Sequence, residues 1–82
     1  MIEVEVLFFA RARELAGVPS SRLELPPGST VALASGRLAE RFPQLRGLLE
    51  RCRFALDEEF ARLEDSIGER STLAVIPPVS GG

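Results

Sequence analysis

The chain has 82 residues, of which 45% are hydrophobic and 27% are charged, and its formal net charge is −2. This composition is typical of a globular protein and excludes a disordered or fibrous one. No apolar run approaches the roughly 20 residues that cross a bilayer, and the basic surface of a nucleic-acid-binding protein is missing. We therefore expect one small domain over residues 1–82, with neither a membrane nor a nucleic acid as partner.

The ten basic residues are all arginine, and the sequence contains neither lysine nor histidine. Arginine stays protonated in proteins, and histidine is the commonest general base near neutral pH. The usual general bases near neutral pH are therefore missing, and carboxylates, the thiol and the chain ends remain for acid–base work. The single cysteine, Cys52, cannot form an internal disulfide, and residues 2–9 lack the basic start and cleavage site of a signal peptide. These two features favour a cytoplasmic location.

Residues 2–9 alternate between the two faces of a strand. The face expected in the core carries Ile2, Val4, Val6 and Phe8. Leu7 and Phe9 belong to the opposite face, where two large apolar groups side by side indicate a surface for a partner. The alternative is that a helix or loop of the same chain covers them.

A short element and a second strand follow. Residues 10–17, "ARARELAG", predict a turn or short helix with Gly17 as its C-cap. Residues 21–25 predict a strand in a hairpin-like arrangement with the first one.

The main helix is expected over residues 31–42, with Ser29 or Thr30 as its N-cap. Its apolar stripe comprises Val31, Ala34, Leu38 and Phe42. Gly36 costs about 1 kcal/mol relative to alanine inside a helix, so a close approach of this helix to the sheet would explain it.

Pro43 is expected to end the main helix or to begin a new turn, and residues 45–52 supply a further short apolar stripe. Residues 53–56 predict a strand, residues 57–60 a turn that leads into a short extended piece, and residues 71–78 the last strand. That strand must end at its two prolines, which cannot donate ladder hydrogen bonds. An α+β fold, with one main helix packed across a small mixed sheet, accounts for this order of elements.

The sequence finishes on "PPVSGG", which predicts a flexible tail over residues 77–82. Its prolines favour an extended polyproline conformation, and Ser80, Gly81 and Gly82 have small side chains or none, so the tail can enter a narrow channel. The only reactive group of the tail is the α-carboxylate of Gly82, which is ionised at neutral pH. Because a bare carboxylate is a poor acyl donor, another protein must activate it, for example by adenylation.

The chain resembles the MoaD family, the sulfur-carrying small subunits of molybdopterin synthase, which have the β-grasp fold of the ubiquitin superfamily. The resemblance rests on "VLFFARARELAG", on "LELPPGSTVALA" and on the closing strand and tail "LAVIPPVSGG". The loops depart from the family pattern: Asp57 in "LDEEF" stands where the family usually has an asparagine, and "IGERSTL" replaces a "DGDEV"-like turn. Asp, Gly and Ser suit the same turn conformations, so the tail is the more specific part of the match.

The resemblance implies a mechanism in two stages. An E1-like enzyme adenylates Gly82 with ATP, and sulfur from a persulfide replaces AMP to leave a thiocarboxylate on Gly82, next to Gly81. The tail then enters the large subunit and gives its sulfur to cyclic pyranopterin monophosphate, towards the dithiolene of molybdopterin. The chain itself is expected to bind no cofactor and no metal, and the family resemblance implies an assembly of two small and two large subunits.

The resemblance also implies which residues contact the activating enzyme and the large subunit. They are Phe9, Arg13, Phe60, Ile76, Pro77, Pro78, Val79 and Ser80. Strand alternation supports Phe9 directly, whereas the others rest on the resemblance.

Two other functions stay open. One is a related carrier, either a sulfur donor for thiazole or tRNA thiolation or a protein modifier, which without lysine could not build chains on its own side chains. The other is a β-grasp interaction domain whose tail has no chemistry. Cys52 is expected to be a small buried hydrophobic side chain. The acidic pairs are expected to be solvated; these are Glu58 with Glu59 and Glu64 with Asp65.

Overall fold

The computed structural model describes residues 1–79, which form a five-stranded mixed sheet with the strand order β2-β1-β5-β3-β4. The strands are β1 (Ile2–Phe8), β2 (Ser20–Leu25), β3 (Arg53–Leu56), β4 (Glu59–Ala61) and β5 (Thr72–Ile76). The helices are α1 (Ala10–Ala16), α2 (Val31–Arg41) and α3 (Arg46–Leu49), with a 3-10 turn, η1, at Pro43–Leu45. The parallel pair β1 and β5 lies at the centre, and the other pairs are antiparallel.

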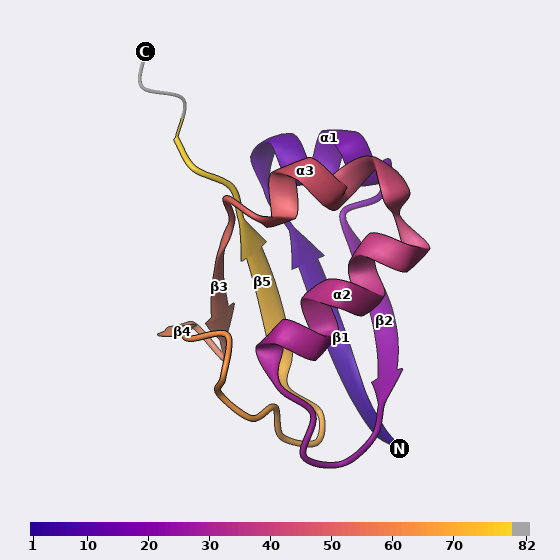
Figure 1. Cartoon of the computed structure of the whole chain (residues 1–82), viewed down its shortest axis with the longest axis vertical. Coiled ribbons are helices and arrows are strands. Elements are labelled where there is room, and N and C mark those ends of the chain that lie inside the picture. Colours follow the sequence, from indigo (N-terminus) through magenta and orange to yellow (C-terminus); the bar gives the residue numbers. More distant parts are fainter. Residues whose placement is uncertain (80–82) are drawn as a thin grey trace.

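The helices gather on one face of this sheet (Figure 1). The longest of them, α2, crosses the face, while α1 and α3 lie near the end where β1 and β5 finish. This arrangement confirms the expected α+β class and the β-grasp fold that the resemblance implied. Within residues 1–79, no helix has the length and apolar character needed to cross a membrane.

The core lies between the sheet and the helices, and the alternation in β1 decides which side chains enter it. The four expected residues of β1 are buried. The largest fully buried side chains are Val4, Val6, Leu25, Val31, Leu38, Leu45, Leu73 and Val75. Phe8 meets Phe42 edge to face, with 5.3 Å between the ring centroids, so the residue just after α2 also packs on the strand.

Both helix ends predicted from local signals are confirmed. Gly17 ends α1 in the left-handed region at φ 80°, and its N–H donates to the carbonyl of Arg13. Thr30 is the N-cap of α2, since its Oγ1 accepts a hydrogen bond from the N–H of Leu33 at 3.2 Å. The hydroxyl of Ser29 donates instead to the carbonyl of Pro26. Of the two candidate caps, Thr30 is the one used.

The explanation offered for Gly36 is wrong. A Cβ built on Gly36 meets no atom within 4 Å, and the residue is exposed. The helix does approach the sheet, but it does so through the buried residues Val31, Ala34 and Leu38. Gly36 faces open space beside β3 and β4.

The hairpin between β3 and β4 turns within two residues, Asp57 and Glu58, which have φ angles of 48° and 72°. Two left-handed residues are the signature of a type I′ turn, whose twist matches that of the strands. The backbone N–H of Asp57 donates to the carbonyl of Thr72 at 2.9 Å, and the N–H of Thr72 donates to Oδ1 of Asp57 at 3.0 Å. The hairpin is thereby tied to the start of β5, which fixes the position of the short strand β4.

Replacing Gly36 by alanine should raise the free energy of unfolding by about 1 kcal/mol, because alanine loses less backbone entropy than glycine when the helix forms. The added Cβ meets no atom within 4 Å. Urea titration followed by circular dichroism measures this change. The matched control is Gly17→Ala, which should lower stability by about 1 kcal/mol because its left-handed φ disfavours a Cβ. Equal effects of the two substitutions would contradict this account of the two glycines.

Candidate functional site

The face of the sheet opposite to the helices carries a row of apolar side chains. Leu7, Ala74, Ala55 and Phe60 are successive cross-strand partners on β1, β5, β3 and β4. Directly opposite partners place their side chains on the same face, so the row runs across four strands. We call this surface, together with Phe9 and Ile76, the open face.

Phe60 and Phe9 remain 68% and 46% exposed. Within residues 1–79, the alternative that a helix or loop of the same chain covers these two rings is therefore wrong. A hollow of about 310 Å³ lies on it. Its lining consists of Leu7, Phe9, Ala55, Glu58, Phe60, Thr72, Ala74 and Ile76.

Three of the residues assigned to partner contacts thus line one hollow: Phe9, Phe60 and Ile76. Arg13 is not among its lining residues; it is exposed on α1. Ala74 was overlooked, although the alternation within "TLAVI" would have placed it on the same face as Ile76.

A cation over an aromatic ring sets the edge of the open face. The guanidinium carbon of Arg53 lies 4.6 Å from the ring centroid of Phe60, within the range of a cation–π interaction. Arg53 is the cross-strand partner of Ile76. This contact depends on the register of the β3–β4 hairpin, which pairs Ala55 with Phe60.

The C-terminal segment leaves the molecule beside the open face. β5 ends at Ile76, as expected from the two prolines. Pro77, expected as the first residue of the tail, is buried, whereas Pro78 and Val79 are exposed, the latter by 93%. Figure 1 shows this segment extending past the end of the sheet where α1 and α3 lie. The assigned residues Ser80, Gly81 and Gly82 lie outside the described part of the chain.

A second hollow, of about 880 Å³, surrounds the point where the chain leaves the sheet. It is lined by Pro77, Pro78 and Val79 together with residues of α1 and α3 and their flanks. Phe9 and Ile76 line both this hollow and the one on the open face. The apolar open face and the base of the C-terminal segment therefore form one continuous surface.

Cys52 carries the single thiol of the chain. Cys52 is half-buried against the core. Burial raises the pKa of its thiol, against a smaller lowering effect of the Arg51 guanidinium, so the thiol is protonated near neutral pH. Among residues 1–79, no group of three or more His, Cys, Asp or Glu side chains is placed to hold a metal ion.

Together, the fold and the site define a small β-grasp protein that presents an apolar sheet face next to an extended C-terminal segment. The chain matches the ThiS family over residues 6–82 and belongs to that family.

Among curated relatives, it is 43% identical over 81 residues to the molybdopterin synthase sulfur carrier subunit of Arabidopsis thaliana, covering 99% of this chain and 84% of that protein. The MoaD resemblance is thereby confirmed.

Solved structures agree on the fold. SAMP1 from Haloferax volcanii has a TM-score of 0.90 and 27% sequence identity, covering 98% of this chain and 99% of that one. A chain from the complex of subunits 1 and 2 of the molybdopterin-converting factor of Helicobacter pylori has a TM-score of 0.72 and 21% identity, covering 99% of this chain and 100% of that one. At that identity the second likeness concerns the fold alone.

The pKa of Cys52 can be tested by alkylation with iodoacetamide, because only the thiolate reacts. In the folded protein, the pH midpoint of the reaction should lie above that of a free cysteine thiol, and it should fall in urea, where burial is lost. Intact mass after timed reaction at several pH values measures both midpoints. A folded midpoint below the one in urea would instead identify Cys52 as an activated thiol.

Proposed function

We propose that this protein is the sulfur-carrier subunit of a molybdopterin synthase, with the Gly82 carboxylate as the point where sulfur is attached. The observation that carries the proposal is the continuity of the open face with the base of the C-terminal segment through Phe9 and Ile76. A partner that binds the open face would hold the tail in a defined direction. The curated sulfur-carrier relative supports the same function.

The chemistry then proceeds on the terminal carboxylate. A carboxylate oxygen of Gly82 attacks the α-phosphorus of ATP and releases pyrophosphate. The terminal sulfur of a persulfide attacks the acyl adenylate and displaces AMP, and a thiol then reduces the acyl disulfide to leave the thiocarboxylate. The chain has neither histidine nor lysine, so the activating enzyme and the large subunit would provide the acid and base groups. ATP belongs to the activating enzyme, and this chain binds no cofactor.

Two partners are proposed for the same surface, an E1-like activating enzyme and the large subunit of the synthase. The Arabidopsis relative, which is named a subunit of molybdopterin synthase, supports a partner of the second kind. Because one open face lies beside one C-terminal segment, the two partners would bind in turn. Contacts would involve Phe9, Arg13, Phe60, Ile76 and residues 77–80, in an assembly of two small and two large subunits in the cytoplasm.

Protein with its Gly82 carboxylate free, incubated with an E1-like enzyme, ATP and a sulfur source, should gain about 16 Da, since sulfur replaces one oxygen. Intact mass spectrometry with fragmentation should locate the gain at Gly82. The control is a chain lacking Gly82, which should gain nothing. If the full chain stays folded but no competent activating enzyme produces the gain, the tail has no sulfur chemistry and an interaction domain becomes the better reading.

Phe60→Asp should weaken binding to the large subunit by about 30-fold, because it removes an exposed aromatic anchor from the proposed interface. Isothermal titration calorimetry measures the change. Stability should hardly change, since the ring is 68% exposed. Leu33→Asp on α2 is the matched control: its side chain is 38% exposed but lies away from the open face, and it should bind normally. Loss of affinity in Leu33→Asp alone would place the interface on the helices.

A protein modifier is the second candidate, and the fold of the Haloferax protein, which is named a small archaeal modifier protein, favours it. In that case the activated Gly82 would form isopeptide bonds with lysines of other proteins. The same mass experiment separates the two candidates, because conjugation adds the mass of this chain to a target and leaves no thiocarboxylate.

A further inference from the structure

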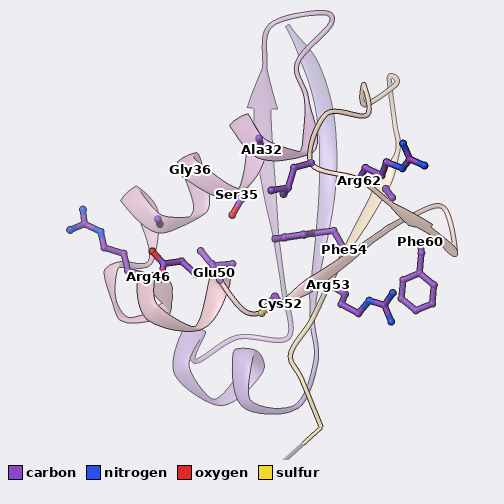
Figure 2. Close-up of a pocket in the computed structure, with 14 residues that line it drawn as sticks. Ala32, Ser35, Gly36, Arg46, Glu50, Cys52, Arg53, Phe54, Phe60 and Arg62 are labelled. Atoms are coloured by element: carbon purple, nitrogen blue, oxygen red, sulfur yellow. The ribbon is translucent and has the colours of Figure 1, made fainter.

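A groove separates α2 from the strands β3 and β4 on the helix side of the sheet. Its volume is about 590 Å³. Figure 2 shows Phe54 near its centre, with Ser35 and Gly36 of α2 on one side and Arg53 and Phe60 of the strands on the other. The residues that α2 contributes are Ala32, Ser35, Gly36 and Ala39. Because their side chains are small or absent, α2 leaves the space above Phe54 unfilled.

Three arginines line the groove, Arg46, Arg53 and Arg62, against a single acidic residue, Glu50. The guanidinium of Arg53 is turned to the open face, where it lies over the Phe60 ring, so Arg46 and Arg62 are the cations available to a ligand in the groove. Figure 2 places Arg46 at one side of the groove and Arg53 and Arg62 at the other. Outside the groove, Oε1 of Glu64 lies 3.9 Å from Nη1 of Arg62. Both side chains are more than 70% exposed, so this ion pair contributes little. The lining is thus positive on a chain whose net charge is −2.

Apolar groups lie between and beside these charges. Leu63, which lines the groove next to Arg62, is 52% exposed, although large apolar side chains are usually buried. Leu49 and Phe54 are buried and form part of its floor. The groove therefore combines an apolar centre with cationic ends.

We propose that this groove binds a short acidic segment of a partner protein, in which carboxylates on both sides flank one apolar side chain. The apolar side chain would sit above Phe54, one carboxylate would reach Arg46, and another would reach Arg62. Guanidinium groups bind carboxylates through two parallel hydrogen bonds, so the arrangement selects acidic over basic segments. The site is separate from sulfur attachment at Gly82 and does not rest on it.

The groove and the open face lie on opposite sides of the sheet and share only Phe60, at the edge strand. A segment bound above Phe54 would leave Leu7, Phe9 and Ile76 accessible. The groove thus suits a protein that stays attached while the partners of the open face exchange.

A fluorescein-labelled peptide, DEELEDE, provides the probe, and KKKLKKK is its charge-reversed counterpart. Fluorescence anisotropy should show saturable binding of the acidic peptide only. Backbone nuclear magnetic resonance shifts on the nitrogen-labelled full chain should map to Ser35, Gly36, Phe54 and Leu63. Shifts confined to the open face, or equal binding of both peptides, would overturn the proposal.

Two variants test the parts of the groove separately. Gly36→Phe should abolish binding by filling the groove, whereas its matched control Gly36→Ala should bind normally, since a Cβ there meets no atom within 4 Å. Arg46→Glu should weaken binding about tenfold or more, the size of a lost charge-assisted hydrogen bond. Arg22→Glu on β2, which makes the same charge change outside the groove, should not.

Circular dichroism checks that each variant folds, and the mass gain at Gly82 should persist in all of them, so failure of the groove and failure of the sulfur-carrier function are distinguishable. Equal loss in Arg22→Glu and Arg46→Glu would mean nonspecific attraction between charges and would overturn the site. The alternative occupant of the groove is a second copy of this chain, which sedimentation without peptide tests. Self-association that Gly36→Phe abolishes would assign the groove to that second copy and overturn the acidic-segment proposal.

Discussion

The parallel pairing of β1 with β5 is the constraint on which the rest of the structure depends. Glu5 is opposite Thr72 and Phe8 is opposite Val75, so the first and last strands lie at the centre of the sheet and run in the same direction. Parallel strands finish at the same edge. This is why Phe9, just after β1, lies next to Ile76 at the end of β5, and why the C-terminal segment begins beside an aromatic side chain from the start of the sequence.

The two faces of the sheet are covered unequally, and this inequality supports the proposed function. The three helices pack on one face and bury the alternating apolar residues of β1 and β5. The other face keeps Phe9 and Phe60 partly in water. Exposed contiguous apolar surface is characteristic of interaction sites, and here it is continuous with the base of the tail. Under the proposed function, a partner bound to this surface would therefore also contact the base of the tail.

Local backbone geometry then fixes the position of β4 and of Phe60 on the open face. The tight turn at Asp57 and Glu58 keeps β4 in register with β3, and the two hydrogen bonds between Asp57 and Thr72 tie that turn to β5. Phe60 is positioned by this short hairpin and by the guanidinium of Arg53 over its ring. On the helix side, the small residues of α2 leave the space above Phe54 that becomes the groove.

The sequence by itself determined the elements whose signals are local. Alternation located β1 and its buried face, Gly17 and Thr30 marked helix ends, and the prolines marked the end of β5, because each signal depends on residues a few positions apart. The tail "PPVSGG" is likewise a pattern of neighbouring residues, and it indicated a carrier. Only the tertiary structure decided that Pro77 is buried and that Gly36 faces a groove. It also decided that the Arg53 guanidinium lies over the Phe60 ring. The same holds for the contact between the open face and the base of the tail, and for the absence of Arg13 from the lining of the hollow on the open face. Those features depend on side chains brought together by pairing between distant segments, and no local pattern encodes the distances between them.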